Sequence, residues 1–170
     1  MWAQTSTVET IGLPDGSASC DETTLPEPDQ FESHYKPSKL EAEIITLEYP
    51  KKGLPVVVVN PSTPIGAWHR KPTPIGKIIV DFVNGKMPAY VETGLSFADV
   101  RDICEGHVLA ARKGVVGERY ILGGHNISMV DFLNLVAKQS RALGIQGAPV
   151  KAPLVRMPYR MAWLRRYSGF

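Results

Sequence analysis

The longest apolar run of the chain covers residues 54–60, where four consecutive valines lie between Pro55 and Asn60. A continuous β-branched run of this length is typical of a parallel strand that is buried on both faces. Residues 40–49 ahead of it have helical spacing, with Leu40, Ile44 and Leu47 on one side and Glu41, Glu43 and Glu48 elsewhere. Residues 1–9 favour an earlier strand. The pattern therefore predicts a strand–helix–strand unit.

The second half of the chain alternates helical and extended patterns in the same way. Residues 97–113 have an apolar face that predicts a helix, formed by Val100, Ile103, Cys104, His107, Val108 and Ala111. Ser128 is a predicted N-cap, and Gly144 a predicted stop, for another helix. The predicted elements are a polar loop over 12–31, a rigid proline-rich loop over 61–74, helices over 75–84, 97–113 and 129–143, and short strands over 87–92 and 119–122.

Composition and charge place few further limits on the protein. The chain has 170 residues, of which 44% are hydrophobic and 21% charged, and these are values of a globular protein. Its two cysteines, Cys20 and Cys104, suggest a reducing compartment and no disulfide framework. The N-terminus has no signal-peptide pattern and no apolar run could span a bilayer, so we expect a cytoplasmic protein.

Charge is unevenly distributed along the chain. Acidic residues dominate the first 50 positions, whereas none follows Asp131, and Arg156, Arg160, Arg165 and Arg166 lie among aromatic and apolar residues. Such a tail is compatible with a basic amphipathic helix on a membrane or nucleic acid. The net charge of only +2 favours an ordinary helix of a substrate-binding region instead, and we expect no nucleic-acid partner.

Candidate acid–base chemistry lies in residues 33–39. Ser33 is a plausible N-cap of a helix on which Tyr35 and Lys39, four residues apart, share one face. An ammonium group close to a phenol favours the phenolate, which makes tyrosine a usable proton acceptor near neutral pH. A single spacing of this kind is nevertheless common in a chain with six tyrosines, and a half-buried tyrosine beside a solvated lysine explains it equally well.

The order of several motifs along the chain is a more specific signal than the Tyr35–Lys39 spacing alone. Hydroxyl residues follow the first strand, the Tyr-x-x-x-Lys helix comes next, and a buried strand then ends in Asn60-Pro61. This order resembles the extended short-chain dehydrogenase/reductases, the NAD-dependent epimerase/dehydratase family, and within it the hopanoid-associated sugar epimerases and dihydroflavonol reductases. The resemblance covers residues 5–158 and is carried by residues 34–39, 57–66, 71–74, 78–82 and 117–124.

The resemblance implies an α/β fold: the C-terminal part of a Rossmann-type parallel sheet, interwoven with a small substrate-binding region. It implies Rossmann segments over 1–66 and 96–124, and substrate-region segments over 67–95 and 125–170. No two of the 15 glycines are separated by one residue, so the Gly-x-Gly-x-x-Gly turn of dinucleotide-binding folds is absent. We therefore expect the rear portion of a longer protein, whether through gene truncation, an incomplete gene model or cloning.

The resemblance also implies a site and its ligands. Thr7, Tyr35 and Lys39 match the family's catalytic residues; Tyr35, Lys39, Asn60 and Pro61 match its cofactor-binding positions; Ser6, Ser62 and Thr63 would face the substrate. The cofactor would be NAD or NADP, although binding by this chain is doubtful, and the substrate a nucleotide-sugar or related hydroxyl or carbonyl compound. A homodimer is possible. The four histidines have no ligand-spaced partners, so we expect no metal site.

Two features depart from the family pattern. Where the family often has His-Val-Asp-Asp, this chain has Asp99-Val100-Arg101-Asp102, and Pro37 restricts where the Tyr35 helix can begin. Three functions stay open: an NAD(P)-dependent sugar epimerase or reductase, a dihydroflavonol-reductase-like carbonyl reductase, and a truncated or degenerate remnant without catalysis. The catalytic trio favours descent from an enzyme, and the missing glycine turn favours inactivity of this chain alone.

Overall fold

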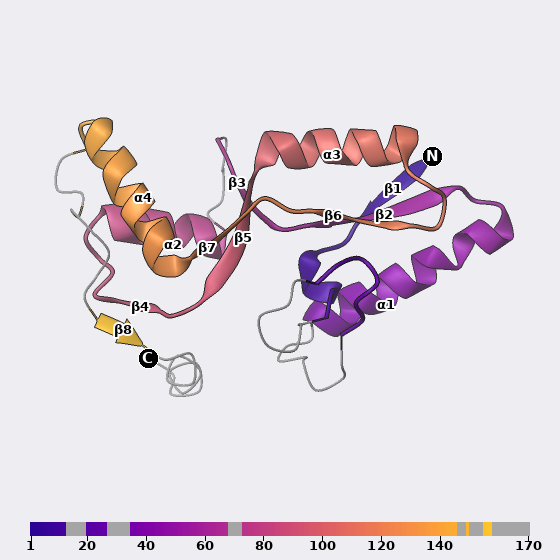
Figure 1. Ribbon diagram of the computed structural model, residues 1–170, viewed down its shortest axis with the longest axis horizontal. Helices are drawn as coiled ribbons and strands as arrows, with labels where there is room; N and C mark the ends of the chain where they lie inside the picture. The colour runs from indigo at the N-terminus through magenta and orange to yellow at the C-terminus, as the bar shows by residue number, and fades with distance from the viewer. Residues whose placement is uncertain (13–19, 27–34, 68–72, 146–148, 150–154, 158–170) are drawn as a thin grey trace. The chain divides into compact units, whose positions relative to one another are not determined.

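The computed structural model describes residues 1–12, 20–26, 35–67, 73–145, 149 and 155–157 (Figure 1). The chain divides into two compact units. The first comprises Met1–Pro64 and Ala98–Gly124, and the second comprises Ile65–Phe97 and His125–Phe170. Because the chain passes from one unit to the other and back, neither unit is a continuous stretch of sequence.

The first unit is built on a parallel sheet in the order β1-β2-β6, formed by β1 (Trp2–Thr5), β2 (Val56–Pro61) and β6 (Arg119–Leu122). Helices α1 (Tyr35–Leu47) and α3 (Val100–Lys113) cover its opposite faces, as Figure 1 shows. The 3₁₀ turns η1 (Val8–Thr10) and η3 (Tyr49–Lys52) follow β1 and α1. Val57, Val58 and Val59 are fully buried, which confirms the predicted central strand.

The α3 face of the sheet is a small apolar layer. Val57 and Val59 of β2 and Ala110 of α3 form its buried part, and Ala3, Tyr120 and Leu122 complete it. The helix lies close to the sheet at Gly106, where an added Cβ atom would meet a Leu122 methyl carbon at 2.7 Å. Gly106 therefore permits the close packing of α3 on β6.

Helix α3 differs in two respects from its prediction. It begins at Val100 and not at Phe97, because Phe97 to Asp99 belong to a strand that sequence patterning missed, β5 (Gly94–Asp99). The predicted apolar face was also partly wrong, since Cys104 and Val108 are exposed and Ala110 is buried. The unusual Asp99-Val100-Arg101 sequence leaves the helix intact.

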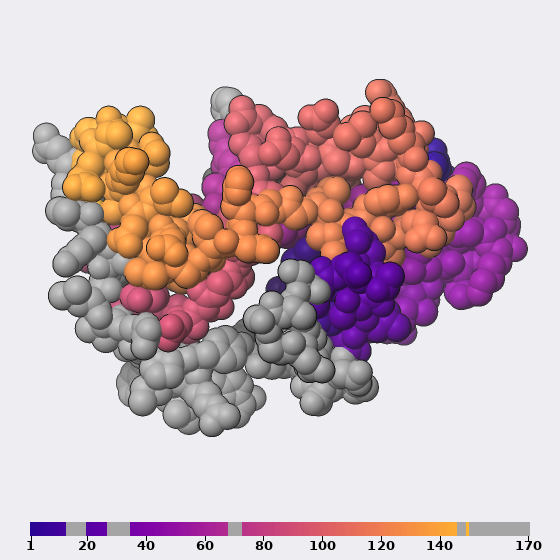
Figure 2. All heavy atoms as spheres, in the orientation of Figure 1, coloured from indigo at the N-terminus to yellow at the C-terminus, as the bar shows by residue number. Residues whose placement is uncertain are grey.

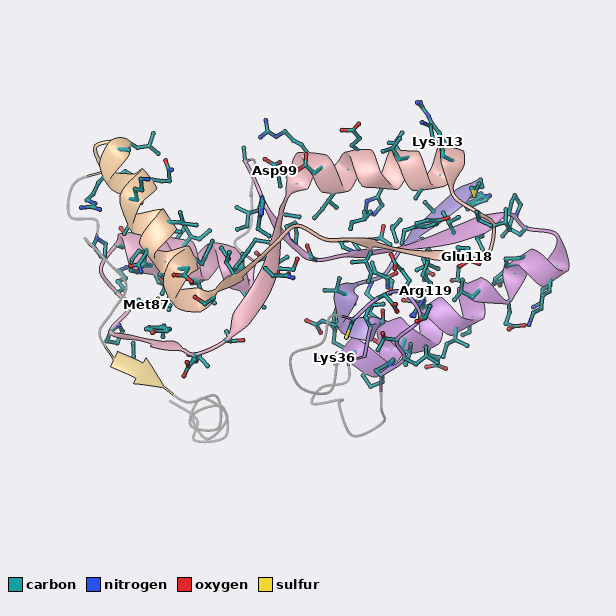
Figure 3. The ribbon with its side chains drawn as sticks, viewed as in Figure 1. Lys36, Met87, Asp99, Lys113, Glu118 and Arg119 are labelled. Carbon is teal, nitrogen blue, oxygen red and sulfur yellow. The ribbon has the colours of Figure 1, made fainter. Side chains whose placement is uncertain are left out.

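Asp99 is the N-cap of α3 and accepts hydrogen bonds from the backbone and side chain of Arg101 (Figure 3). The Arg101 side-chain hydrogen bond, followed by that of its backbone amide, lowers the pKa of the Asp99 carboxyl to about 2. The residue that departs from the family pattern thus has a local capping role.

Polar contacts join α1 to the face of the sheet that it covers. The predicted amphipathic pattern of α1 was wrong here: Glu43 is 1% exposed, whereas Ile44 and Ile45 are more than half exposed. The Glu43 carboxylate accepts hydrogen bonds from Asn60 Nδ2 at 3.0 Å and Thr10 Oγ1 at 2.9 Å, and it pairs with Arg119 Nη1 at 2.8 Å. These contacts compensate the burial of the charge and bring an acidic residue to the inner face of the helix.

Arg119 and Glu22 join the segment after Cys20 to the free edge of β6. Arg119, labelled in Figure 3, donates from Nε to the Glu22 carbonyl oxygen at 3.0 Å, and the Glu22 carboxylate accepts from the Ile121 amide at 2.9 Å. Glu22 thereby satisfies an edge amide that has no strand partner among the described residues.

The second unit packs two helices on short strands. Its elements are α2 (Pro74–Val83), β4 (Ala89–Val91), most of β5, β7 (His125–Ser128), α4 (Met129–Ala142) and β8 (Val155–Met157). Strands β5 and β7 are antiparallel and belong to a sheet in the order β3-β5-β7, which β3 (Thr63–Ile65) enters as the chain leaves the first unit; β4 and β8 pair in parallel.

Aromatic and aliphatic side chains form the core of this unit. Phe82 of α2, Tyr90 of β4 and Leu133 of α4 are buried together, and the rings of Phe97 and Phe132 stack with centroids 4.3 Å apart. One face of α4 (orange in Figure 2) is exposed to solvent, and Leu135 on this face is 49% exposed. Helix α4 thus has one buried and one exposed face.

Most predicted elements of the second unit are confirmed. Ser128 caps α4 by accepting from the Asp131 amide, and Gly144 follows with a φ of 71°. Strand β4 lies within its predicted range, and helix α2 (Pro74–Val83) is offset by one residue from the predicted 75–84. One prediction was wrong, since β3 interrupts the proline-rich loop, and strand β7, which begins at His125, was not predicted. Ser33, His34, His69 and the tail from residue 158 lie outside the described residues.

Loss of the Arg119 charge should destabilise the first unit. In Arg119→Met the Glu43 carboxylate stays buried without its ion partner, which should lower the free energy of unfolding by about 3–5 kcal/mol. Urea unfolding followed by circular dichroism measures this difference. Lys51→Met is the control, because the exposed Lys51–Glu48 pair should contribute less than about 0.5 kcal/mol. Equal stability of the two variants would contradict the role given to Arg119.

Leu133 should carry a large share of the stability of the second unit. Leu133→Ala removes a fully buried side chain and should cost about 2–5 kcal/mol, since the cavity collapses only partly. Leu135→Ala, on the exposed face of the same helix, should change stability by less than about 0.5 kcal/mol. Hydrogen exchange of the α4 amides provides the comparison, and similar protection in both variants would contradict it.

Candidate active site at the carboxyl end of the parallel sheet

Polar side chains gather where β1 and β2 end. Ser6 and Thr7 follow β1, and Asn60, Ser62 and Thr63 lie at the end of β2 or just beyond. The parallel register places Thr5 beside Val59, and the Ser6 amide donates to the Val59 carbonyl at 2.8 Å. The structure therefore brings the residues predicted after the two strands together at the carboxyl end of the sheet, where ligands of parallel α/β sheets bind.

Several polar atoms at this edge are buried without a hydrogen-bond partner among the described residues. They are Ser6 Oγ, Ser62 Oγ and Asn60 Oδ1, and all three residues are at least nine-tenths buried. Buried polar atoms are normally hydrogen-bonded, since leaving one unpaired costs free energy. Two hydroxyls and one amide oxygen are thus available to a polar ligand.

Thr7 has a defined conformation at this edge. It is the N-cap of η1, and its Oγ1 accepts from the Glu9 amide at 3.3 Å. Its carbonyl oxygen accepts from Thr10 Oγ1 at 2.7 Å and Asn60 Nδ2 at 3.2 Å. Because the side chain of Thr7 is only partly buried and its hydroxyl proton is unused in these contacts, it can still donate one hydrogen bond.

Tyr35 and Lys39 lie together in the first turns of α1. The Lys39 Nζ atom is 5.9 Å from the centroid of the Tyr35 ring, at the outer limit of a cation–π contact. Tyr35 is 51% exposed and Lys39 is half-buried, and the Tyr35 phenol makes no hydrogen bond to a described residue. Pro37 is accommodated in the first turn, where a missing N–H leaves no gap in the helix.

Asn60 was predicted to contact a cofactor, but most of its side-chain contacts are to other residues of the protein. Its Nδ2 group is directed to Thr7, Thr10 and Glu43, which leaves only Oδ1 for a ligand. Pro61, the last residue of β2, is partly buried. Sequence reasoning missed Glu43, Thr10 and Arg119. A usable signal was present, because Glu43 stands four residues after Lys39 and eight after Tyr35, on the same helix face.

His107, on the face of the sheet covered by α3, has two hydrogen-bond partners. His107 on α3 approaches Thr5 Oγ1 with Nε2 at 3.0 Å, and its Nδ1 donates to the Ile103 carbonyl at 2.8 Å. Within the described part of the chain, no three His, Cys, Asp or Glu residues are grouped as metal ligands. No described helix is both long and apolar enough to cross a membrane.

Comparison with known proteins places this arrangement in a family. The family model described as "NAD dependent epimerase/dehydratase family" matches residues 2–123. A "Putative dihydroflavonol 4-reductase" from Synechocystis sp. is 42% identical over 164 residues, which are 94% of this chain and 47% of that protein.

Solved structures agree with this match. A nucleoside-diphosphate-sugar epimerase from Pseudomonas aeruginosa is similar with a TM-score of 0.79 and 27% identity, over 96% of this chain and 51% of that one. A dTDP-glucose 4,6-dehydratase from Bacillus anthracis, in complex with NAD, has a TM-score of 0.70 and 25% identity, over 92% and 48%. The chain spans about half the length of these relatives. It belongs to the NAD-dependent epimerase/dehydratase family, as its motifs predicted, and it has that family's parallel α/β fold.

Proposed function

We propose that this chain carries the proton-transfer part of an NAD(P)-dependent epimerase or reductase site that acts on a hydroxyl or carbonyl group of a small molecule. The observation that carries the proposal is the placement of Tyr35 beside Lys39 on the helix that follows β1 and precedes β2. Polar atoms of Ser6, Asn60 and Ser62 that have no partner in the described part of the chain support it, because a bound ligand would satisfy them.

The catalytic roles follow from the chemistry of the three residues. The phenol of Tyr35 would give a proton to, or take one from, the substrate oxygen. The Lys39 ammonium would attract the negative charge that develops on the phenolic oxygen during proton transfer, and it could hold a ribose hydroxyl. The Thr7 hydroxyl would donate a hydrogen bond to the same substrate oxygen. Ser6, Ser62 and Thr63 would complete the substrate side.

The residues present fit the nicotinamide end of a dinucleotide. Asn60 Oδ1 is a buried acceptor that no described residue contacts by a hydrogen bond, and Pro61 ends the strand beside it. When bound, NAD or NADP would accept or supply the hydride. Asn60, Pro61, Tyr35 and Lys39 would orient it. The chain has no Gly-x-Gly-x-x-Gly turn for the pyrophosphate, so we propose that this chain alone is inactive.

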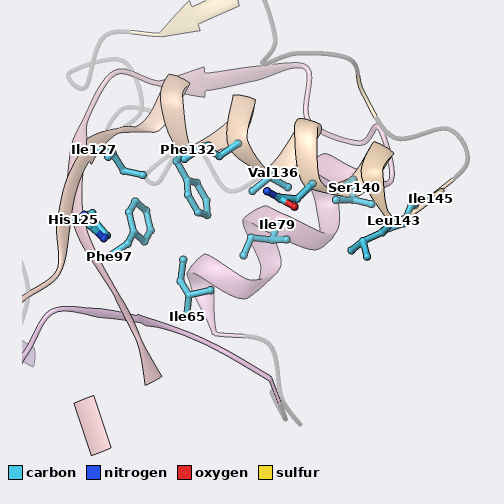
Figure 4. Close-up of a pocket in the computed structure, with 13 residues that line it drawn as sticks. Ile65, Ile79, Phe97, His125, Ile127, Phe132, Val136, Ser140, Leu143 and Ile145 are labelled. Carbon is cyan, nitrogen blue, oxygen red and sulfur yellow. The ribbon is translucent and has the colours of Figure 1, made fainter. Parts of the chain in front are cut away.

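A carbonyl reductase acting on an apolar compound is a second candidate. The name of the Synechocystis relative favours it, and so does a mostly apolar hollow of about 750 Å³ in the second unit (Figure 4). Phe97, Phe132 and Ile127 lie at one end of this hollow, while Ile79 and Val136 are among its other lining residues. The first candidate, a sugar epimerase related to the hopanoid-associated group, would need polar contacts instead.

We also propose roles for the longer segments of the chain. The segments 67–95 and 125–170 would bind substrate, and 1–66 with 96–124 would form the nucleotide-binding part. We also propose a cytoplasmic location and a possible homodimer. A catalytically inactive remnant is the alternative to any enzyme.

Tyr35→Phe should abolish turnover in a polypeptide that supplies the glycine-rich half ahead of Met1. Removing the phenolic oxygen deletes the proton carrier, and such groups are worth about 10²–10⁴-fold in rate. Cofactor binding should change little in this variant, whereas Lys39→Met should weaken both turnover and cofactor binding. Thr7→Val should cost less than Tyr35→Phe. Steady-state kinetics with NADH and NADPH give this ranking, and near-normal turnover of Tyr35→Phe would refute the proposed function.

The 170-residue chain alone should bind NAD and NADP poorly or not at all. The pyrophosphate loop, and the residue that reads the adenine ribose, come from strands that this sequence does not include. Calorimetric titration with both dinucleotides measures the affinity. Binding at micromolar concentration would show that the residues of this chain suffice.

A further inference from the structure

The buried Glu43 carboxylate accepts hydrogen bonds from three described residues. Arg119 Nη1 approaches Oε1 at 2.8 Å, while Thr10 Oγ1 and Asn60 Nδ2 approach Oε2 at 2.9 and 3.0 Å. The Glu43 side chain is 1% exposed and that of Arg119 is 9% exposed, so water does not replace these contacts. A group that accepts on both oxygens is therefore required at this position.

An amide of the same shape can keep only part of these contacts. A glutamine has one accepting oxygen and one donating nitrogen. Whichever way it is turned, its nitrogen faces either the Arg119 guanidinium or the Asn60 amide group. Glu43→Gln thus removes the function of the carboxylate while it keeps almost the same volume.

Two of the residues that contact Glu43 also contact the Thr7 carbonyl oxygen. The Thr10 hydroxyl is within hydrogen-bond distance of both the Glu43 carboxylate and the Thr7 carbonyl oxygen, and so is Asn60 Nδ2. The single hydroxyl proton of Thr10 serves one acceptor at a time, and the two amide protons of Asn60 fill the remaining contacts. One carboxylate therefore organises the backbone position of Thr7.

The same carboxylate belongs to the helix that carries Tyr35 and Lys39. The three residues are spaced four apart and share one face of α1, with Glu43 about 12 Å along the axis from Tyr35. Arg119 holds the other carboxylate oxygen from β6. Glu43 thus links the Tyr–Lys helix, the Thr7 turn and the end of β2.

We propose that Glu43 is a positioning residue, which acts through Thr10 and Asn60 to set Thr7 relative to the helix of Tyr35 and Lys39. This inference rests on the proposed function. Small displacements of reacting groups can reduce the rate by about 10²-fold, so the effect should appear in kcat. Cofactor affinity should change less than kcat, because Asn60 Oδ1, the proposed cofactor acceptor, is not the atom through which Asn60 contacts Glu43.

The first test uses the 170-residue chain and needs no turnover. Glu43→Gln, the milder Thr10→Val and the control Glu41→Gln, an exposed glutamate on the same helix, are compared by ¹⁵N NMR. Glu43→Gln and Thr10→Val should both shift the amide signals of Thr7 and Glu9, and Glu41→Gln should not. Unchanged Thr7 and Glu9 signals in folded Glu43→Gln would overturn the proposal.

The second test uses the polypeptide with the glycine-rich half. Glu43→Gln should lower kcat about 10- to 100-fold with the KM for cofactor within about two-fold, since only positioning is lost. Glu43→Asp, which restores two acceptors, should recover part of kcat, and a role in stability alone would not give this split. Glu41→Gln should match the parent.

The outcomes separate the two hypotheses. If Tyr35→Phe abolishes turnover but folded Glu43→Gln and Thr10→Val both stay within two-fold of the parent kcat, the positioning role is refuted and the proposed function stands. If Glu43→Gln does not fold, Thr10→Val decides, because it keeps the Glu43–Arg119 ion pair. If Tyr35→Phe keeps its turnover, the proposed function fails and the NMR comparison alone decides the role of Glu43.

Discussion

The ion pair between Glu43 and Arg119 is the contact on which the first unit depends. A buried carboxylate is costly unless its charge is compensated, and here a guanidinium, a hydroxyl and an amide all donate to it. These donors come from β6, η1 and β2, so a single group on α1 gathers three other elements. Arg119 extends the network to Glu22, whose carboxylate occupies the outer edge of the sheet.

This arrangement has a consequence for the candidate site. The polar network lies at the carboxyl end of the sheet, and it holds Thr7 and Asn60 through their carbonyl and amide groups. Ser6 Oγ, Ser62 Oγ and Asn60 Oδ1 have no hydrogen-bond partner among the described residues. The same region therefore contains a satisfied structural layer and a set of available groups, which is the division expected where a rigid scaffold presents a binding site.

Patterns confined to one element were predictable. The four valines, the Ser128 cap and Gly144 depend on a few neighbouring residues, and they predicted β2 and both ends of α4 correctly to within a residue. Patterns that depend on a distant partner were not. The faces of α1 and α3 were misjudged because hydrophobicity alone ranks Ile44 above Glu43 and Val108 above Ala110. Strands β5 and β7 were missed, since their pairing joins segments about 30 residues apart.

By itself, the amino-acid sequence determined the family, the parallel strand–helix–strand unit and the presence of a Tyr-x-x-x-Lys pair, because these depend on the order and local spacing of residues. Only the tertiary structure decided that Glu43 faces inward and that Arg119 and Thr10 compensate its charge. It alone also showed that three polar atoms at the carboxyl end of the sheet have no partner among the described residues. The physical reason is that a buried charge is stable only beside its donors, and those donors come from positions 10, 60 and 119, which meet only when the sheet has formed.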